Sequence, residues 1–163
     1  MKPKGWLLLL LIPVFLSAGG AFLSKEVLVL KIVNTDDFRR LPVFVRVASQ
    51  FTLSYINSIY LEPAAEEFEV GEGEEMTLKG VRTKSPAVAQ YYGFEDGREY
   101  YPVKRKMKSF ALRVGMTSPQ TLAWGNEKIS FKEMGEKGDR VEVGVVRMTL
   151  AHYLFSMFLK EKG

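Results

Sequence analysis

The stretch from Phe51 to Val70 constrains the fold more than any other part of the chain, because its pattern is that of short β-strands interrupted by a proline. Up to Ser58 the residues alternate as they do in a strand, where every second side chain falls on the same face. One face carries Phe51, Leu53, Tyr55 and Asn57. Pro63 cannot donate a hydrogen bond to a neighbouring strand, and a second run, 64–70, follows it. The stretch therefore predicts either two strands joined near Glu62–Pro63 or one bent strand at a sheet edge.

Further short strands, separated by turn residues, are expected along most of the remaining chain. The β-branched or alternating runs are 26–33, 43–47, 51–60, 64–70, 76–81, 110–114, 121–124, 128–131 and 141–146. No helical pattern separates these runs, and short strands at such spacing are typical of antiparallel β proteins. We expect residues 24–147 to form a mainly β domain, either an antiparallel sandwich or a barrel-like structure.

The first 23 residues have the pattern of an export segment. Lys2 and Lys4 precede an apolar run from Trp6 to Leu16, and small residues follow at 17–21. This order is typical of a signal peptide. The run from Trp6 to Leu23 is also close to the shortest length that spans a bilayer as a helix. We therefore expect 1–23 to be a signal peptide or a retained membrane anchor, with the following domain outside the cytoplasm.

The last residues, 148–163, predict a short amphipathic helix. Polar residues recur three or four positions apart and form one narrow stripe, whereas the other faces are Met, Leu, Ala, Tyr and Phe; the stripe is Thr149, His152, Ser156 and Lys160. A helix that docks on the sheet is the simpler interpretation. The breadth of the apolar surface also fits a helix at a membrane interface or against a retained N-terminal helix.

Composition excludes several functions. The chain has no cysteine, which excludes disulfides, a thiol nucleophile and thiolate metal sites. The formal net charge of +4 falls to +2 without Lys2 and Lys4, too little to favour nucleic-acid binding. His152 is the one histidine and has no cysteine or second histidine as a partner. We expect no catalytic residues, metal or cofactor, and we therefore do not expect an enzyme.

Tyrosines and polar residues around the first strand pair are the candidate ligand-binding residues. Residues 55–62 carry an amide, a hydroxyl and a carboxylate close together, and a tyrosine pair lies in the long connection 82–98. Connections of this length are often functional, and amphipathic tyrosine rings are suited to lining a groove. The candidate set is Tyr55, Asn57, Ser58, Glu62, Tyr91 and Tyr92.

Two charged clusters are interpreted as solvated surface. Charged side chains beside a sheet edge more often keep the edge soluble than form a cation site or an acid/base pair, and this applies to Glu62, Glu66, Glu67 and Glu69. The basic run 104–108 is expected to be a solvated lead-in to the strand at 110–114. Contact of this run with anionic lipid or an acidic partner is the alternative. We expect the weakly patterned residues 82–98 to be an irregular connection.

Three short motifs resemble a bacterial family of unknown function. They are Tyr55-Ile56-Asn57-Ser58-Ile59 with Glu62 and the acidic run 66–70 after it, Phe110-Ala111-Leu112-Arg113-Val114-Gly115, and Val141-Glu142-Val143. Together they resemble domain-of-unknown-function family 1850 from about Glu26 to Val146. The chain departs from that family at Asn57, where histidine is usual, and lacks a Gly-Ala-Gly segment between Arg82 and Gly93.

The resemblance implies an accessory role, because members of that family often accompany the TAXI class of tripartite ATP-independent periplasmic (TRAP) transporters. It implies an exported, membrane-associated protein, periplasmic or on the outer face of the cytoplasmic membrane, secreted or anchored through Trp6–Leu23. Its partner would be a transporter membrane subunit or a solute-binding protein, and not nucleic acid. The alternative hypothesis is an extracytoplasmic β domain that binds a small ligand or a cation.

Overall fold

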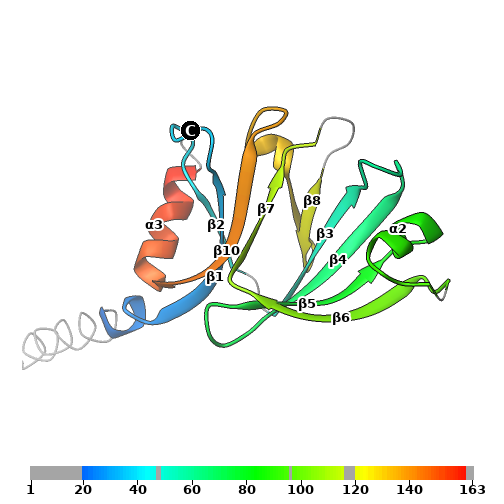
Figure 1. Ribbon diagram of the computed structural model, residues 1–163. Helices are drawn as coiled ribbons and strands as arrows, with labels where there is room; N and C mark the ends of the chain where they lie inside the picture. The colour runs from blue at the N-terminus through cyan, green and yellow to red at the C-terminus, as the bar shows by residue number, and fades with distance from the viewer. Residues whose placement is uncertain (1–19, 47–48, 96, 116–119, 161–163) are drawn as a thin grey trace, which may run out of the picture. The chain divides into compact units, whose positions relative to one another are not determined.

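The computed structural model describes residues 20–46, 49–95, 97–115 and 120–160 of the chain (Figure 1). The described residues fall into two compact units. The larger unit is Leu28–Val146, and the smaller combines residues 20–27 with residues 147–160. Strands β1 and β10 run from one unit into the other.

The larger unit consists mainly of two antiparallel β-sheets, as the sequence predicts. One sheet has four strands in the order β2-β1-β10-β7, and the other has six in the order β6-β5-β4-β3-β8-β9. The strands are β1 Glu26–Asn34, β2 Val43–Val45, β3 Gln50–Ile56, β4 Pro63–Val70, β5 Met76–Arg82, β6 Tyr100–Met107, β7 Ser109–Arg113, β8 Thr121–Trp124, β9 Glu127–Ser130 and β10 Arg140–Thr149. A short 3₁₀ turn, η1 Phe131–Glu133, follows β9.

The stretch from Phe51 to Val70 forms the two joined strands β3 and β4. They pair in register from Gln50 opposite Glu69 to Ile56 opposite Pro63. Pro63 is the first residue of β4, a position where its missing N–H interrupts no ladder. The alternative of a bent edge strand is wrong, because β3 and β4 are both interior strands of the six-stranded sheet.

A stack of three phenylalanine rings holds the two sheets together. Phe51 and Phe68 lie on adjacent strands, with ring centroids 4.8 Å apart and planes 7° from parallel. Phe110 belongs to β7 of the other sheet, and its centroid lies 5.1 Å from that of Phe68. Aliphatic residues of both sheets surround the stack, including Leu30, Leu53, Leu122 and Val143. The core therefore lies between the sheets, and aromatic pairs of this kind add about 0.5–1.5 kcal/mol beyond burial.

The cations of the basic run 104–108 are exposed, as expected, but most of the run belongs to a strand of its own and does not simply lead into the next one. Strand β6 already begins at Tyr100, pairs with β5, and is separated from β7 by Lys108 alone. Along β6, Val103, Arg105 and Met107 line the space between the sheets, whereas Lys106 reaches Glu75 at 4.0 Å. The number of basic residues in the run does not reveal this alternation, which places Arg105 on the inner face.

The connection 82–98 contains a helix, contrary to the expectation of an irregular segment. Helix α2 is Pro86–Tyr91, with Pro86 in its first turn. Ser85 caps it, because the Ser85 hydroxyl accepts a hydrogen bond from the Val88 N–H. Val88 and Ala89 are the buried residues of this helix. Beyond the helix, Phe94 stacks on Tyr101 of β6 with centroids 4.5 Å apart. The connection is therefore held against the rest of the larger unit by the buried residues of α2 and by the Phe94–Tyr101 stack.

The smaller unit contains the ends of β1 and β10 and the helix α3, Leu150–Lys160. The Leu150 N–H donates to the Lys25 carbonyl at 2.8 Å, and Arg147 pairs with Glu26 at 3.2 Å. The helix predicted from residue 148 onward is present. The large apolar side chains that it exposes are Leu154, Phe155, Met157, Phe158 and Leu159.

The expected signal peptide or anchor lies almost wholly outside the described residues, of which only 20–23 belong to it. Those four residues are helical. Among the residues that the structure describes, no helix combines the length and the apolar character needed to cross a membrane.

Candidate ligand-binding site

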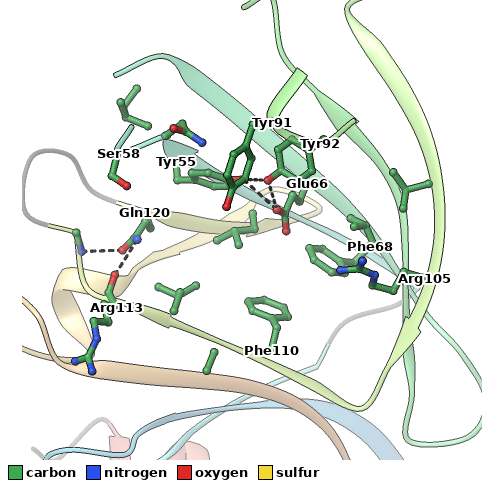
Figure 2. Close-up of a pocket in the computed structure, with 18 of the residues that line it drawn as sticks. Tyr55, Ser58, Glu66, Phe68, Tyr91, Tyr92, Arg105, Phe110, Arg113 and Gln120 are labelled. Atoms are coloured by element: carbon green, nitrogen blue, oxygen red, sulfur yellow. Dashed lines mark hydrogen bonds between the residues drawn. The ribbon is translucent and has the colours of Figure 1, made fainter. Parts of the chain in front are cut away.

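An open cavity of about 1090 Å³ lies between the two sheets of the larger unit (Figure 2). Strands β3 to β6 contribute one wall and β7 contributes the facing wall, while the end of α2 covers one side. Its apolar lining includes Leu53, Phe68, Leu78, Met107, Phe110 and Leu112. A cavity of this size, largely apolar and with a few convergent polar groups, is the usual form of a small-molecule site.

Glu66 is the carboxylate on the inner face of this cavity. Ala64, Glu66 and Phe68 alternate along β4, and both Ala64 and Phe68 are buried. Because every second side chain of a strand shares a face, Glu66 points inward with them. Figure 2 shows its carboxylate directed into the cavity beneath the tyrosine rings.

Two tyrosine hydroxyls hold the Glu66 carboxylate. Tyr92 donates to Oε1 at 2.6 Å and Tyr55 donates to the same oxygen at 3.0 Å. The two hydroxyls also contact one another. Tyr55 comes from β3 and Tyr92 directly follows α2, so the cluster connects the helix to the sheet beside the cavity. We name these three residues the Glu66 cluster.

The Glu66 cluster raises the pKa of both tyrosines above the ordinary value of 10.0. Burial of the hydroxyl is the main cause for each, since a phenolate loses its hydration there. For Tyr55 the negative charge of Glu66 is the next cause, and for Tyr92 it is the hydrogen bond to Glu66. Both hydroxyls therefore remain protonated donors at neutral pH.

Two arginines reach the cavity from different strands. Arg113 of β7 donates to the Gly138 carbonyl at 2.8 Å and lies 3.7 Å from Asp36. Arg105 of β6 is exposed and pairs with no carboxylate among the residues that the structure describes. Arg113 is thus held by Gly138 and Asp36, whereas Arg105 faces the apolar lining of the cavity.

The predicted site residues separate into two groups. Tyr55, Tyr91 and Tyr92 lie together at the cavity, and the rings of Tyr91 and Tyr92 meet edge to face with centroids 5.5 Å apart. Ser58 lies exposed at the rim. Glu62 is exposed and is not among the described residues that line the cavity.

Asn57 has a structural role, although it also borders the cavity. Its side chain is 6% exposed, and its Oδ1 accepts from the N–H groups of Ile59 and Tyr60 at 2.9 and 3.1 Å. Its own N–H donates to the Glu62 carbonyl at 2.8 Å. These bonds form the turn between β3 and β4, in which Leu61 has a positive φ of 57°.

From the sequence, Glu66 is assigned to a group of carboxylates that keep a sheet edge soluble, and Arg105 to a solvated basic run; neither is placed in the candidate binding site. Glu67 and Glu69 do fit that interpretation, since they pair with Arg82 at 3.0 Å and Lys79 at 2.8 Å. The missed signal was alternation: Glu66 shares its face with Phe68, and Arg105 shares its face with Met107. Comparing each charged residue with the residue two positions further along its strand would have placed both side chains on the inner face.

No group of three or more His, Asp or Glu residues suited to a metal ion occurs in the described part of the chain. Comparison of the chain with protein-family models, with curated proteins and with solved structures finds no match.

Replacing Asn57 and, as a control, the adjacent Ser58 tests whether Asn57 stabilises the fold. We expect Asn57→Ala to lower the free energy of unfolding by about 1–2 kcal/mol, because two backbone N–H groups lose their acceptor. Ser58→Ala should change it by less than about 0.5 kcal/mol, since the residue is exposed. Urea denaturation of both variants measures this, and equal effects would contradict the assignment.

The Glu66 cluster predicts a loss of stability at alkaline pH. A raised folded-state pKa means that the stabilisation is complete below the unfolded-state value of 10.0 and is lost as the pH rises above it. We expect the free energy of unfolding to fall between about pH 9 and pH 11, and less steeply in Tyr92→Phe, which has no proton to lose there. Denaturation midpoints across this range provide the measurement. Parallel curves for the two proteins would show that Tyr92 does not contribute.

Proposed function

We propose that the larger unit binds a small, largely apolar molecule in the cavity between its sheets. The observation that carries the proposal is the combination of an open space of about 1090 Å³ with one convergent polar cluster. The space is open to solvent and leaves apolar side chains uncovered, and a concave apolar surface of this kind needs a reason to persist. Binding of a ligand supplies such a reason, because it buries apolar surface that water otherwise covers.

Binding, and not catalysis, fits the side chains at the cavity. The hydroxyls of Tyr55 and Tyr92 both donate to Glu66, and their raised pKa makes either of them a poor base. Ser58 has no hydrogen-bonded base among the described residues. The proposal therefore rests on shape and polarity and involves no chemical step.

Neutral N-phenylnaphthylamine, whose fluorescence rises in apolar surroundings, tests the proposal on the full chain. We expect it to bind, and we expect the double variant Val103→Trp/Leu112→Trp, which places indoles into the cavity from facing walls, to weaken binding at least about fivefold. Both residues line the cavity on strands of different sheets.

A matched pair of substitutions on the outer face controls for probe bound elsewhere. Thr52 and Thr77 alternate with the buried residues Leu53 and Leu78 and do not line the cavity. Thr52→Trp/Thr77→Trp should leave the affinity unchanged. Equal affinity of both double variants, with circular dichroism confirming that each is folded, would overturn the proposal.

We also propose that the chain is a membrane-associated accessory protein, with a transporter subunit or a solute-binding protein as its partner. The apolar residues of α3 support this second function, since Phe158 is 66% exposed and Phe155 is 63% exposed. An apolar helix surface of this kind favours a membrane interface. The resemblance to family 1850 and the apolar start of the chain support the same location.

The absence of cysteine allows a direct test of membrane contact. A fluorophore on a single Phe158→Cys variant should be quenched by vesicles of brominated phosphatidylcholine. The same label on His152→Cys, on the polar stripe of α3, is the control and should be quenched about twofold less. Equal quenching, or none at residue 158, would contradict an interfacial α3.

A further inference from the structure

One oxygen of the Glu66 carboxylate is available to a ligand. Oε1 accepts both tyrosine hydroxyls, whereas Oε2 accepts a hydrogen bond from none of the residues that the structure describes. The side chain is half-buried between the apolar residues of the inner face. A carboxylate that has lost part of its hydration is stabilised strongly by a cation or a charged donor.

We propose that the cavity takes an organic ammonium ion with an apolar body, and that Glu66 Oε2 receives the cationic head. This inference rests on the proposed binding function and names the class of ligand. The two tyrosine hydroxyls satisfy Oε1 and orient the carboxylate, which leaves the second oxygen directed into the cavity (Figure 2). A neutral or anionic head offers this oxygen a weaker partner or none.

Aromatic rings beside the carboxylate reinforce the choice of a cation. Tyr55, Tyr91 and Tyr92 all line the cavity next to Glu66, and Figure 2 shows their rings gathered around the carboxylate. The edge-to-face contact of Tyr91 with Tyr92 turns the two ring planes 90° apart. Rings with different orientations present π faces from more than one side, which is the arrangement that attracts ammonium groups.

The remaining lining accommodates an apolar body and sets its direction. Phe68, Phe110 and Leu112 form the surface beyond Glu66, without another carboxylate in the described lining. Arg105 faces the same space from β6, two strands away from β4 in the sheet. The positive charge of Arg105 repels the ammonium head of the ligand. The head is therefore held on the β4 side of the cavity, and the apolar body extends along Phe68 and Phe110.

A series of ligands with one apolar body and different heads tests the inference. Octylammonium, octanol and octanoate compete with bound N-phenylnaphthylamine on the full chain near neutral pH. We expect octylammonium to displace the probe at about tenfold lower concentration than octanol, and octanoate to be the weakest. Octanoate displacing best would overturn the inference and assign recognition to Arg105.

Variants on opposite faces of one strand locate the head. Glu66→Gln keeps an oxygen that accepts from both tyrosines but removes the charge, and it should abolish the preference for octylammonium over octanol. Glu67→Gln, on the outer face, should retain it. Arg105→Gln leaves the Glu66 cluster intact and should strengthen octylammonium binding about twofold to fivefold. An unchanged preference in Glu66→Gln would overturn the inference.

The outcomes also separate this inference from the function on which it rests. If N-phenylnaphthylamine binds and is sensitive to Val103→Trp/Leu112→Trp while the three heads compete equally, the cavity binds ligands but does not select ammonium. If the neutral probe does not bind in the cavity, the proposed function fails and the inference fails with it.

Discussion

The stack of Phe51, Phe68 and Phe110 is the contact on which the larger unit depends, because it joins strands of both sheets in one continuous aromatic interaction. The chain changes sheets at Lys108, so β6 and β7 must diverge directly beside the stack. Phe68 and Phe110 also line the cavity. The same rings thus pack the core and form the surface of the adjoining space, which links the stability of the fold to the shape of the site.

The inner faces carry charges that a purely structural core would exclude. Glu66 and Arg105 occupy positions where alternation calls for apolar residues, and neither pairs with the other among the described contacts. Glu66 is half-buried, and burying a charge is unfavourable unless it is hydrogen-bonded, which the two tyrosine hydroxyls achieve for its Oε1. Local departures of this kind from the rules of folding are expected where function requires them.

The sequence predicted the strands better than it predicted the site. Alternation and turn residues identified β3, β4 and their junction at Pro63, since both signals are local. Helix α2 was missed because its six residues are too short to show a period, although Ser85-Pro86 is a recognisable start. Tyr55 and Tyr92 were in the predicted set, and alternation would have added Glu66. The contact between them could not be predicted, because Tyr92 meets β4 only through the tertiary packing of α2, which no local pattern encodes.

Asn57, although predicted as a ligand-binding residue, stabilises the turn between β3 and β4. The turn after β3 needs one acceptor that reaches the N–H groups two and three residues ahead, and the amide oxygen of Asn57 does so with its two lone pairs. Asn34, 2% exposed, ends β1 in the same way and accepts from Asp36 and Asp37. A neutral imidazole nitrogen has a single lone pair and satisfies one of the two donors. Asparagine is therefore better suited than histidine to close this turn, because its one side-chain oxygen accepts from both N–H groups.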